Sequence, residues 1–235
     1  MRLQATDEIF SMFPDAVLGV VITPDLDNSG DPPEIAALLR AAEASLQREL
    51  AGVQISEHPH IAPWRAAYKQ FGAKPKDYPS SIENLARRVL KGYTLPHINT
   101  LVDAYNAISL RLIVPVGGED LAAIRGDVLL TVATEHETPM LLLGEREERA
   151  PRPGEVIYKD DLGAICRRWN WKEAERTKLT AATRDAVLVI EGLPPVEQTL
   201  IEQAVQELAA LVERHCGGSV RTAFVSRSSP SVDLS

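Results

Sequence analysis

Hydrophobic residues recur at helical spacing through the first half of the chain. Residues 33–51 place isoleucine and leucine side chains on one side, which is typical of a helix that packs against a core. Ser80 and Glu83 have the spacing of a capping box, and Gly92 follows the next apolar run, so a helix is expected between them. The same spacing predicts helices over residues 64–72, from near residue 96, and from 195 to about 216.

Short runs of β-branched and aliphatic residues dominate from residue 111 to about 191, separated by turns rich in Gly, Pro and charge. The runs are RLIVPV, VLLTVAT, PMLLLG, EVIYKD, GAICRRW and AVLVIEG. Two more strands are expected at AVLGVVI (16–22) and SVRTAFV (219–225). This order of elements predicts an α+β fold with helices packed on largely antiparallel sheets. No repeat or long linker divides the chain, so a single domain spanning residues 1–235 is expected, with residues 226–235 as a flexible tail.

A polar stripe follows the helix that starts near residue 96. Asn99, Asp103 and Asn106 recur on one face of it, beside an apolar stripe that suits a core. Capping explains Asn99, because an amide at a helix start accepts backbone N–H bonds, whereas Asn106 lies too deep for that role. The alternative is that these side chains anchor loops around a pocket or point into it. Both interpretations stay open.

Residues 166–180 combine two of the three tryptophans in the chain with a local excess of positive charge. The basic residues there are Arg167, Arg168, Lys172, Arg176 and Lys178. Aromatic faces beside cations can stack bases or hold a ribose and a phosphate. The alternative is a strand on which Trp169 and Trp171 pack one face while the arginines stay solvated.

The segment PVGGED (115–120) is a further candidate site. Gly117 and Gly118 would let a backbone approach a ligand closely and offer N–H groups to an oxyanion, although a plain turn is the alternative. The histidines show no metal-ligand spacing, so neither a metal nor another cofactor is expected. Cys166 and Cys216 have no activating motif and no Gly-x-Ser-x-Gly occurs, so a covalent nucleophile is not supported.

Composition narrows the function classes. The chain of 235 residues is 45% hydrophobic and 25% charged, which is ordinary for a globular protein. Its net charge of −8 argues against a broad grip on DNA or another polyanion, so any nucleic-acid contact is expected to be local. No apolar run is long enough to cross a membrane, and the first ten residues show no secretion signal, so a cytoplasmic location is expected.

One long segment carries a family resemblance. SSIENLARRVLKGYTLPHINTLVDAYNAISLRLIVPVGGEDLAAIRGD resembles the B3/B4 domain of the phenylalanyl-tRNA synthetase β subunit. The matching residues are Pro96, Ile98, Asn99, Val102, Asp103, Asn106, Pro115, Asp120 and Gly126. The resemblance continues through LLLG (141–144), EVIYKD and Thr183 with AVLVIEG, and it covers roughly residues 60–192. Because a synthetase subunit is far longer, the chain is most similar to free-standing B3/B4 proteins, whose tryptophan motifs correspond to Trp64–Tyr68 and Arg167–Trp171.

The resemblance implies a sandwich-like core of sheets flanked by helices in three layers, and an editing pocket. In the synthetase, this domain hydrolyses tyrosine wrongly esterified to phenylalanine tRNA. The acid that reads the tyrosine hydroxyl falls near Glu191, a family histidine falls on Gly117 and is absent, and a Gly-rich wall falls on the bulky Arg168–Trp171. These departures predict a reshaped pocket with a different specificity.

The expected substrate pocket consists of Asn99, Asp103, Asn106, Gly117, Gly118, Arg168, Trp169, Asn170, Trp171, Thr180 and Glu191. Contacts with tRNA are expected from Arg167, Arg168, Lys172 and Arg176. Together these groups predict a concavity sized for an acylated adenosine, ringed by the two indoles and Glu191.

Three functions remain open on the sequence. The first is a trans-editing hydrolase that deacylates mischarged tRNA by placing water at the ester, with the tRNA 3′ end as partner. The second is a binding module for a free amino acid or a similar small ligand, without turnover. The third, a tRNA-binding accessory protein without pocket chemistry, fits the negative net charge least. The sequence does not indicate an oligomeric state.

Overall fold

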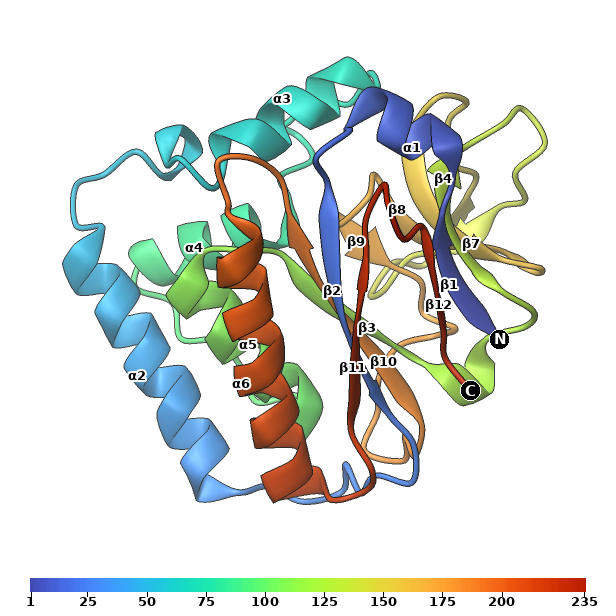
Figure 1. Ribbon diagram of the computed structural model, residues 1–235. Coiled ribbons are helices and arrows are strands. Elements are labelled where there is room, and N and C mark those ends of the chain that lie inside the picture. The colour runs from blue at the N-terminus through green and yellow to red at the C-terminus, as the bar shows by residue number, and fades with distance from the viewer.

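Two main β-sheets, one two-stranded sheet and a layer of helices make up the computed structural model, which describes residues 1–235. The α-helices are α1 (Asp7–Met12), α2 (Pro33–Glu49), α3 (Ala62–Gln70), α4 (Ser81–Leu90), α5 (Thr100–Leu112) and α6 (Gln198–Cys216). Two 3₁₀ turns are η1 (Ile55–Glu57) and η2 (Leu121–Ala123). Helices α2, α4, α5 and α6 lie together on one side of the strands, and α1 and α3 lie across one end (Figure 1).

The larger sheet has the strand order β12-β1-β4-β7-β8-β9. Its strands are β1 (Arg2–Ala5), β4 (Val128–Val132), β7 (Val156–Asp160), β8 (Gly163–Arg167), β9 (Lys172–Glu173) and β12 (Ser231–Asp233). The smaller sheet has the order β11-β2-β10-β3, with β2 (Val17–Thr23), β3 (Val116–Asp120), β10 (Ala186–Gly192) and β11 (Arg221–Val225). A separate pair joins β5 (Met140–Leu141) to β6 (Glu148–Arg149). Only β1 and β4 pair in parallel, so the expected α+β class with largely antiparallel sheets is confirmed.

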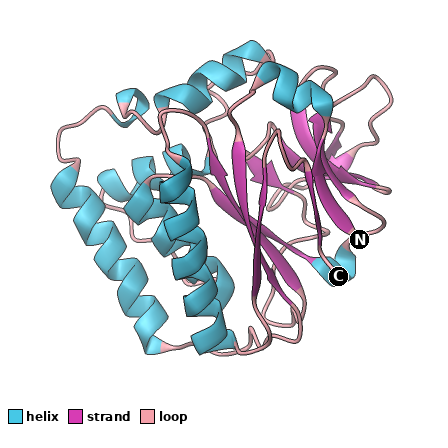
Figure 2. Cartoon of the chain, viewed as in Figure 1, coloured by secondary structure: helices cyan, strands magenta, loops and turns pink.

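Alternation along the strands of the smaller sheet divides the core into layers. In β2, Leu18, Val20 and Ile22 pack toward the larger sheet, while Val21 packs with residues of α5 and α6. A third apolar cluster joins α2, α4 and α5. The helix layer, the smaller sheet and the larger sheet are therefore stacked in that order, with strands gathered on one side of the molecule (Figure 2).

Three expectations about elements were wrong or incomplete. The RLIVPV strand at 111–116 does not form, because α5 continues to Leu112 and the strand β3 begins only at Val116. The predicted flexible tail is instead ordered, since β12 pairs with β1 and Leu234 is buried. Strand β1 and helix α1 at the N-terminus were not predicted from the sequence. No helix has both the length and the apolar character required to cross a bilayer.

Candidate functional site

A cavity of about 210 Å³ lies between the two sheets. Strands β3 and β10 form one wall, β7, β8 and β9 form the opposite wall, and residues of α4 and α5 close one side. Its deepest lining is apolar, with Leu3, Val128 and Val187 each at most 2% exposed. Asn84 and Leu143 are exposed lining residues, so the mouth lies between α4 and the loop after β5.

Strand register explains which side chains reach the cavity from the smaller sheet. Residues two apart on a strand share a face, so Val187, Val189 and Glu191 of β10 all line the cavity. On the neighbouring strand β3, Gly117 pairs with Val189 and Glu119 pairs with Val187. The lack of a side chain at Gly117 leaves space opposite the larger sheet, and Glu119 adds a second acid to the same face.

Glu191 is held by a network of buried hydrogen bonds. Its Oε1 accepts from the Tyr158 hydroxyl at 2.5 Å, and its Oε2 accepts from Asn170 Nδ2 at 2.6 Å. The Tyr68 hydroxyl donates to Asn170 Oδ1 at 2.7 Å, which fixes the orientation of that amide. Burial raises the pKa of Glu191 to about 7, while hydrogen bonding from Tyr158, Asn170 and Trp169 favours its charged form. The carboxyl can therefore gain or lose a proton near neutral pH.

The turn between β8 and β9 has a backbone that normally suits glycine. Arg168 and Trp169 have φ values of 49° and 64°, in the left-handed region that side chains disfavour. Trp169 is completely buried, with its ring 4.8 Å from that of Phe13 and 5.0 Å from that of Trp64. Packing of these three rings holds the turn in place, and Trp169 to Trp171 form one end of the cavity.

The structure brings most of the expected pocket residues together. Those that line the cavity are Asn106, Gly117, Gly118, Trp169, Asn170, Trp171 and Glu191. The expectation was wrong for Asn99, Asp103, Arg168 and Thr180, which do not line it. Thr180 instead lies in a turn, where its backbone N–H donates to Thr183 Oγ1 and its carbonyl accepts from Asn28 Nδ2. Arg168 instead stacks on the rings of Tyr78 and Trp171.

The polar stripe on α5 has two uses. Asn99 caps the helix by accepting from the Val102 N–H at 3.0 Å, and its Nδ2 donates to the Leu179 carbonyl. Asp103 is buried and accepts from His97 Nδ1 at 2.7 Å, which ties down the segment before the helix. Only Asn106, one turn deeper, lines the cavity. The capping explanation thus holds for Asn99 and the pocket explanation for Asn106.

The expected tRNA contacts at residues 167 and 168 need correction, because both arginines are only 4% exposed. Arg167 makes a two-point ion pair with the buried Glu155, at 2.6 and 3.0 Å. The guanidinium of Arg168 stacks on the ring of Tyr78 at 3.7 Å and on that of Trp171 at 4.5 Å. Neither side chain is available to a phosphate backbone.

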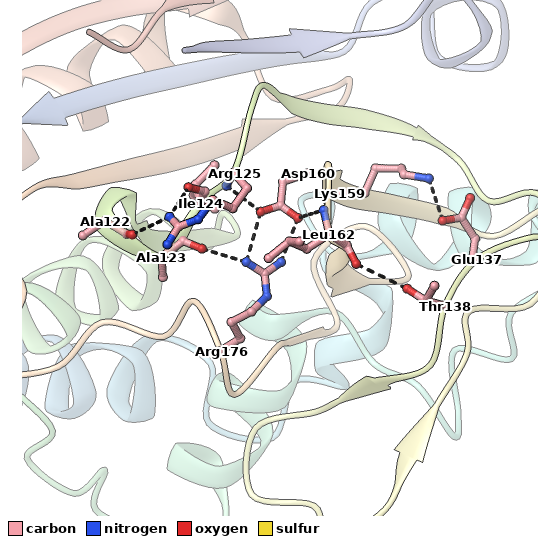
Figure 3. Close-up of polar contacts among 10 residues, drawn as sticks. All are labelled: Ala122, Ala123, Ile124, Arg125, Glu137, Thr138, Lys159, Asp160, Leu162 and Arg176. Carbon is pink, nitrogen blue, oxygen red and sulfur yellow. Dashed lines mark hydrogen bonds and ion pairs between the residues drawn. The ribbon is translucent and has the colours of Figure 1, made fainter.

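The other two expected tRNA contacts are partly exposed but already paired with acids. Lys172 Nζ donates to Glu145 at 2.8 Å. Arg176 points toward Asp160 and donates to both of its carboxylate oxygens, at 3.0 and 2.8 Å (Figure 3). These pairs leave residues 166–180 with little free positive charge.

Sequence reasoning missed several cavity residues. Tyr105, Tyr158, Glu119 and Glu173 line the cavity but stood in segments interpreted as core, strand or turn. Residues 187, 189 and 191 alternate along one strand, so they share a face whose last residue, Glu191, is an acid. The pairing of Glu119 with that face depends on β3, which was interpreted as a turn or loop. No group of three or more His, Cys, Asp or Glu side chains has an arrangement that could hold a metal ion.

The site is thus a ligand-sized cavity between the sheets of a three-layer α+β protein, with aromatic walls and acidic groups. A family model described as the B3/4 domain matches residues 63–217, which contain nearly all of this cavity. The chain belongs to the B3/4 domain family.

Comparison with solved structures gives a neighbour of low identity. The chain is similar to an N-terminal fragment of the phenylalanyl-tRNA synthetase beta-subunit from Pyrococcus horikoshii, with 11% sequence identity and a TM-score of 0.48. The match covers 93% of this chain and 50% of the fragment, so the chain spans about half the length of that structure. No curated protein matches the chain.

Proposed function

We propose that this protein hydrolyses the ester bond of mischarged aminoacyl-tRNA, with the acyl group held in the cavity between the sheets. The observation that carries the proposal is the position of Glu191, at one end of a cavity within the B3/4 segment and beside Trp169 and Trp171. The fragment to which the chain is similar comes from a tRNA synthetase subunit, and this fits the same substrate class.

The chemistry needs only a positioned water and a base. Tyr158 and Asn170 each use one oxygen of Glu191, and every carboxylate oxygen has a second lone pair that can accept from a water. A pKa near 7 suits a general base at neutral pH. The water oxygen attacks the acyl carbon, Glu191 takes the water proton, and the ester C–O bond breaks. The proton then passes to the departing ribose oxygen, which restores the carboxylate.

The cavity is large enough for only part of the proposed substrate. A volume of about 210 Å³ lies below the ~300–1,000 Å³ typical of sites for drug-sized ligands. In the proposed complex the acyl side chain occupies this space and the terminal adenosine lies at the mouth, beside Asn84 and Leu143. This differs from the concavity expected from the sequence, which was to hold the whole acylated adenosine.

A basic surface beside the mouth supplies the tRNA contacts that residues 167 and 168 cannot make. Residues 65–91 contain two acidic residues, Asp77 and Glu83, against a larger basic set in a chain of net charge −8. The basic residues are Arg65, Lys69, Lys74, Lys76, Arg87, Arg88 and Lys91.

Several of these cations are exposed and lie close to the cavity. Arg88 on α4 and Lys91, which directly follows the helix, come four and seven residues after Asn84, so they continue the same side of the helix from the mouth. Lys74 and Lys76 precede the same helix. All four are exposed and form no ion pair, unlike Arg65 and Arg87, which pair with Glu83. This surface suits a few phosphates near a tRNA 3′ end.

A deacylation assay over a panel of mischarged tRNAs tests the proposal. The wild-type protein is expected to release at least one amino acid faster than spontaneous hydrolysis, and Glu191→Gln is expected to lower that rate by about 10²-fold or more. Glu213→Gln, an exposed change on α6, is the matched control and leaves the rate unchanged. No acceleration across the panel would contradict the hydrolase.

A second candidate function is a binding module for a free amino acid. The small volume of the cavity favours it, because a free amino acid fits there without a nucleotide at the mouth. A thermal-shift screen with single amino acids and no tRNA separates the two candidates. Stabilisation by one amino acid, together with no deacylation, favours the binding module, whereas deacylation without such stabilisation favours the hydrolase.

A further inference from the structure

The cavity lining includes two interacting carboxyl groups, one from each sheet. Glu119 comes from β3 and Glu173 from β9, and both line the cavity. A Cβ added to Gly117 would lie 3.0 Å from Glu173 Oε1, so this carboxyl occupies the space that the glycine leaves. Glu119 is two residues further along the same strand face. It is only 9% exposed, and its Oε2 has no hydrogen-bond partner.

No basic side chain forms an ion pair with Glu119 or Glu173, although Arg176 lies near enough to Glu119 to oppose the rise of its pKa. The nearest basic side chains are engaged elsewhere, with Lys172 on Glu145, Arg176 on Asp160 and Lys178 on Glu175. Burial and repulsion between the two carboxyls raise the pKa of Glu119, and burial raises that of Glu173 to about 7. A buried carboxyl oxygen without a donor is costly, so a ligand that brings N–H donors gains hydrogen bonds and charge complementarity here.

Among the other titratable groups that line the cavity, Lys172 is the one cation, and its Nζ is already paired with Glu145. Burial raises the pKa of Tyr105, Tyr158 and Cys166, which keeps the phenols and the thiol neutral. Glu191 adds a third carboxyl, which is already hydrogen-bonded to Tyr158 and Asn170. Every acid at the cavity therefore favours a positive ligand.

The other lining residues indicate what the uncharged part of such a ligand would be. The rings of Trp171 and Tyr105 line it, and aromatic faces attract cations. The deep lining formed by Leu3, Val128 and Val187 is apolar. Two carboxyls with aromatic neighbours suit an organic ammonium better than a metal ion, which requires more oxygen ligands.

We propose that Glu119 and Glu173 form an ammonium-binding site, so that the cavity selects ligands with a primary ammonium on an apolar body. An amino acid and its ester both belong to this class through their α-amine. The inference rests on the cavity of the proposed function and deepens it by giving the charge that the ligand must carry. It applies whether or not the ligand is hydrolysed.

Calorimetry on the full chain without tRNA tests the site with three probes of similar shape. The probes are 2-phenylethylamine, the neutral 2-phenylethanol and the anionic 3-phenylpropionate. The amine is expected to bind at least about tenfold more tightly than the alcohol, and the anion more weakly than either. Repeating the amine titration in buffers of different ionisation enthalpy is expected to detect proton release near pH 6, because a bound cation displaces the carboxyl proton.

Variants assign the effect to the two acids. Glu119→Gln and Glu173→Gln are each expected to lower the amine affinity about tenfold and to abolish most of the proton release, while binding of the alcohol stays unchanged. Glu175→Gln is the matched control, since Glu175 lies two residues away, pairs with Lys178 and does not line the cavity. Thermal denaturation confirms that each variant is folded. Should a variant fail to fold, the amine–alcohol comparison on the wild type still decides.

Several outcomes would overturn the site. These are equal affinity for the amine and the alcohol, no binding of the amine at millimolar concentration, or folded Gln variants that keep wild-type amine affinity and proton release. The hydrolase fails separately. Amine binding without any deacylation contradicts only the hydrolase, and deacylation with no preference for a cationic probe contradicts only the ammonium site.

Discussion

At the scale of single residues, the partners of each charge decide its role. Arg167 stands in the most basic-looking stretch around the two tryptophans, yet its guanidinium is buried against Glu155. A buried ion pair whose partner is removed leaves an uncompensated charge in the core. Arg167 is therefore a structural residue, and its sequence neighbours Trp169 and Asn170 are the ones that reach the cavity.

Arg167→Met is expected to lower the free energy of unfolding by about 1–3 kcal/mol, because Glu155 then loses two short hydrogen bonds and keeps only Arg168 Nη2, at 3.5 Å. Urea denaturation measures the change. Arg88→Met, which alters an exposed and unpaired cation, is the control and is expected to stay within about 0.5 kcal/mol of the wild type. Equal stability of the two variants would show that the Arg167–Glu155 pair does not stabilise the core.

The raised pKa values of Glu173 and Glu191 predict that stability falls as pH rises from about 4.5 to about 7. In this window the folded state keeps protons that the unfolded state has lost, so the slope of the unfolding free energy against pH is negative. Each carboxyl contributes a decrease of up to ~3 kcal/mol. Glu137, whose pKa is lowered, acts in the opposite direction below this window.

Denaturation at a series of pH values checks this slope. Glu191→Gln is expected to flatten the curve between pH 4.5 and 7, because an amide does not titrate. Glu213→Gln, at an exposed position on α6, is expected to run parallel to the wild type. A wild-type curve that rises through the window would contradict the assignment of these carboxyls.

At the scale of elements, the sequence predicted a helix correctly where its capping residue lies next to it in the chain. Ser80 and Asn99 accept the capping hydrogen bonds that their spacing predicted, and α4 and α5 begin directly after them. The errors concern contacts between distant segments. β12 is ordered by β1, which lies more than 220 residues away in the chain, and β3 is a strand despite two glycines because β10 pairs with it. The pattern of residues within a short segment cannot reveal such pairing, because the partner strand lies elsewhere in the chain.

Asn99→Ala tests the cap of the helix that lines the cavity. The change removes the bond to the Val102 N–H and the bond to the Leu179 carbonyl, so a loss of about 1–2 kcal/mol is expected. Chemical denaturation measures it. Glu197→Ala is the matched control, because Glu197 precedes α6 without making a capping hydrogen bond, and its effect is expected to be near zero. Equal effects of the two changes would contradict the capping role.

The two glycines of β3 are expected to behave differently, since they face opposite sides of the sheet. A Cβ at Gly118 would lie 2.5 Å from Leu188 Cδ2 and 3.1 Å from the Val187 carbonyl, so Gly118→Ala is expected to cost about 1–3 kcal/mol. Gly117→Ala meets only Glu173 and is expected to cost less than Gly118→Ala but to weaken binding of 2-phenylethylamine. Denaturation and calorimetry on both variants check this. Loss of binding only in Gly118→Ala would be the contrary result.

At the scale of the whole molecule, positive charge is concentrated in one segment of an otherwise acidic chain. The chain carries −8 overall, while residues 65–91 carry a positive excess that ends at the mouth of the cavity. The family resemblance located the cavity segment, as the match to residues 63–217 confirms. It did not locate this surface, because which cations are exposed depends on the pairing of Glu83, Glu145, Glu155 and Asp160 in the folded chain.

This concentration of positive charge predicts a shallow salt dependence for tRNA binding. Phosphate contacts release condensed counterions, and each lowers log K against log salt by about 0.7–0.9. Lys74, Lys76, Arg88 and Lys91 allow about four such contacts, so a slope of about −3 is expected. Filter binding of tRNA at a series of salt concentrations measures the slope. Arg88→Ala with Lys91→Ala is expected to make it shallower by about 1–2.

The control is a double change of the same charge at other exposed positions. Arg214→Ala with Arg227→Ala removes two unpaired cations from α6 and from the turn between β11 and β12, so the slope is expected to stay that of the wild type. The two double variants have the same net charge, and a difference between them must come from position. Equal slopes for both would mean that tRNA binds through overall charge, and the surface on α4 would then have no special role.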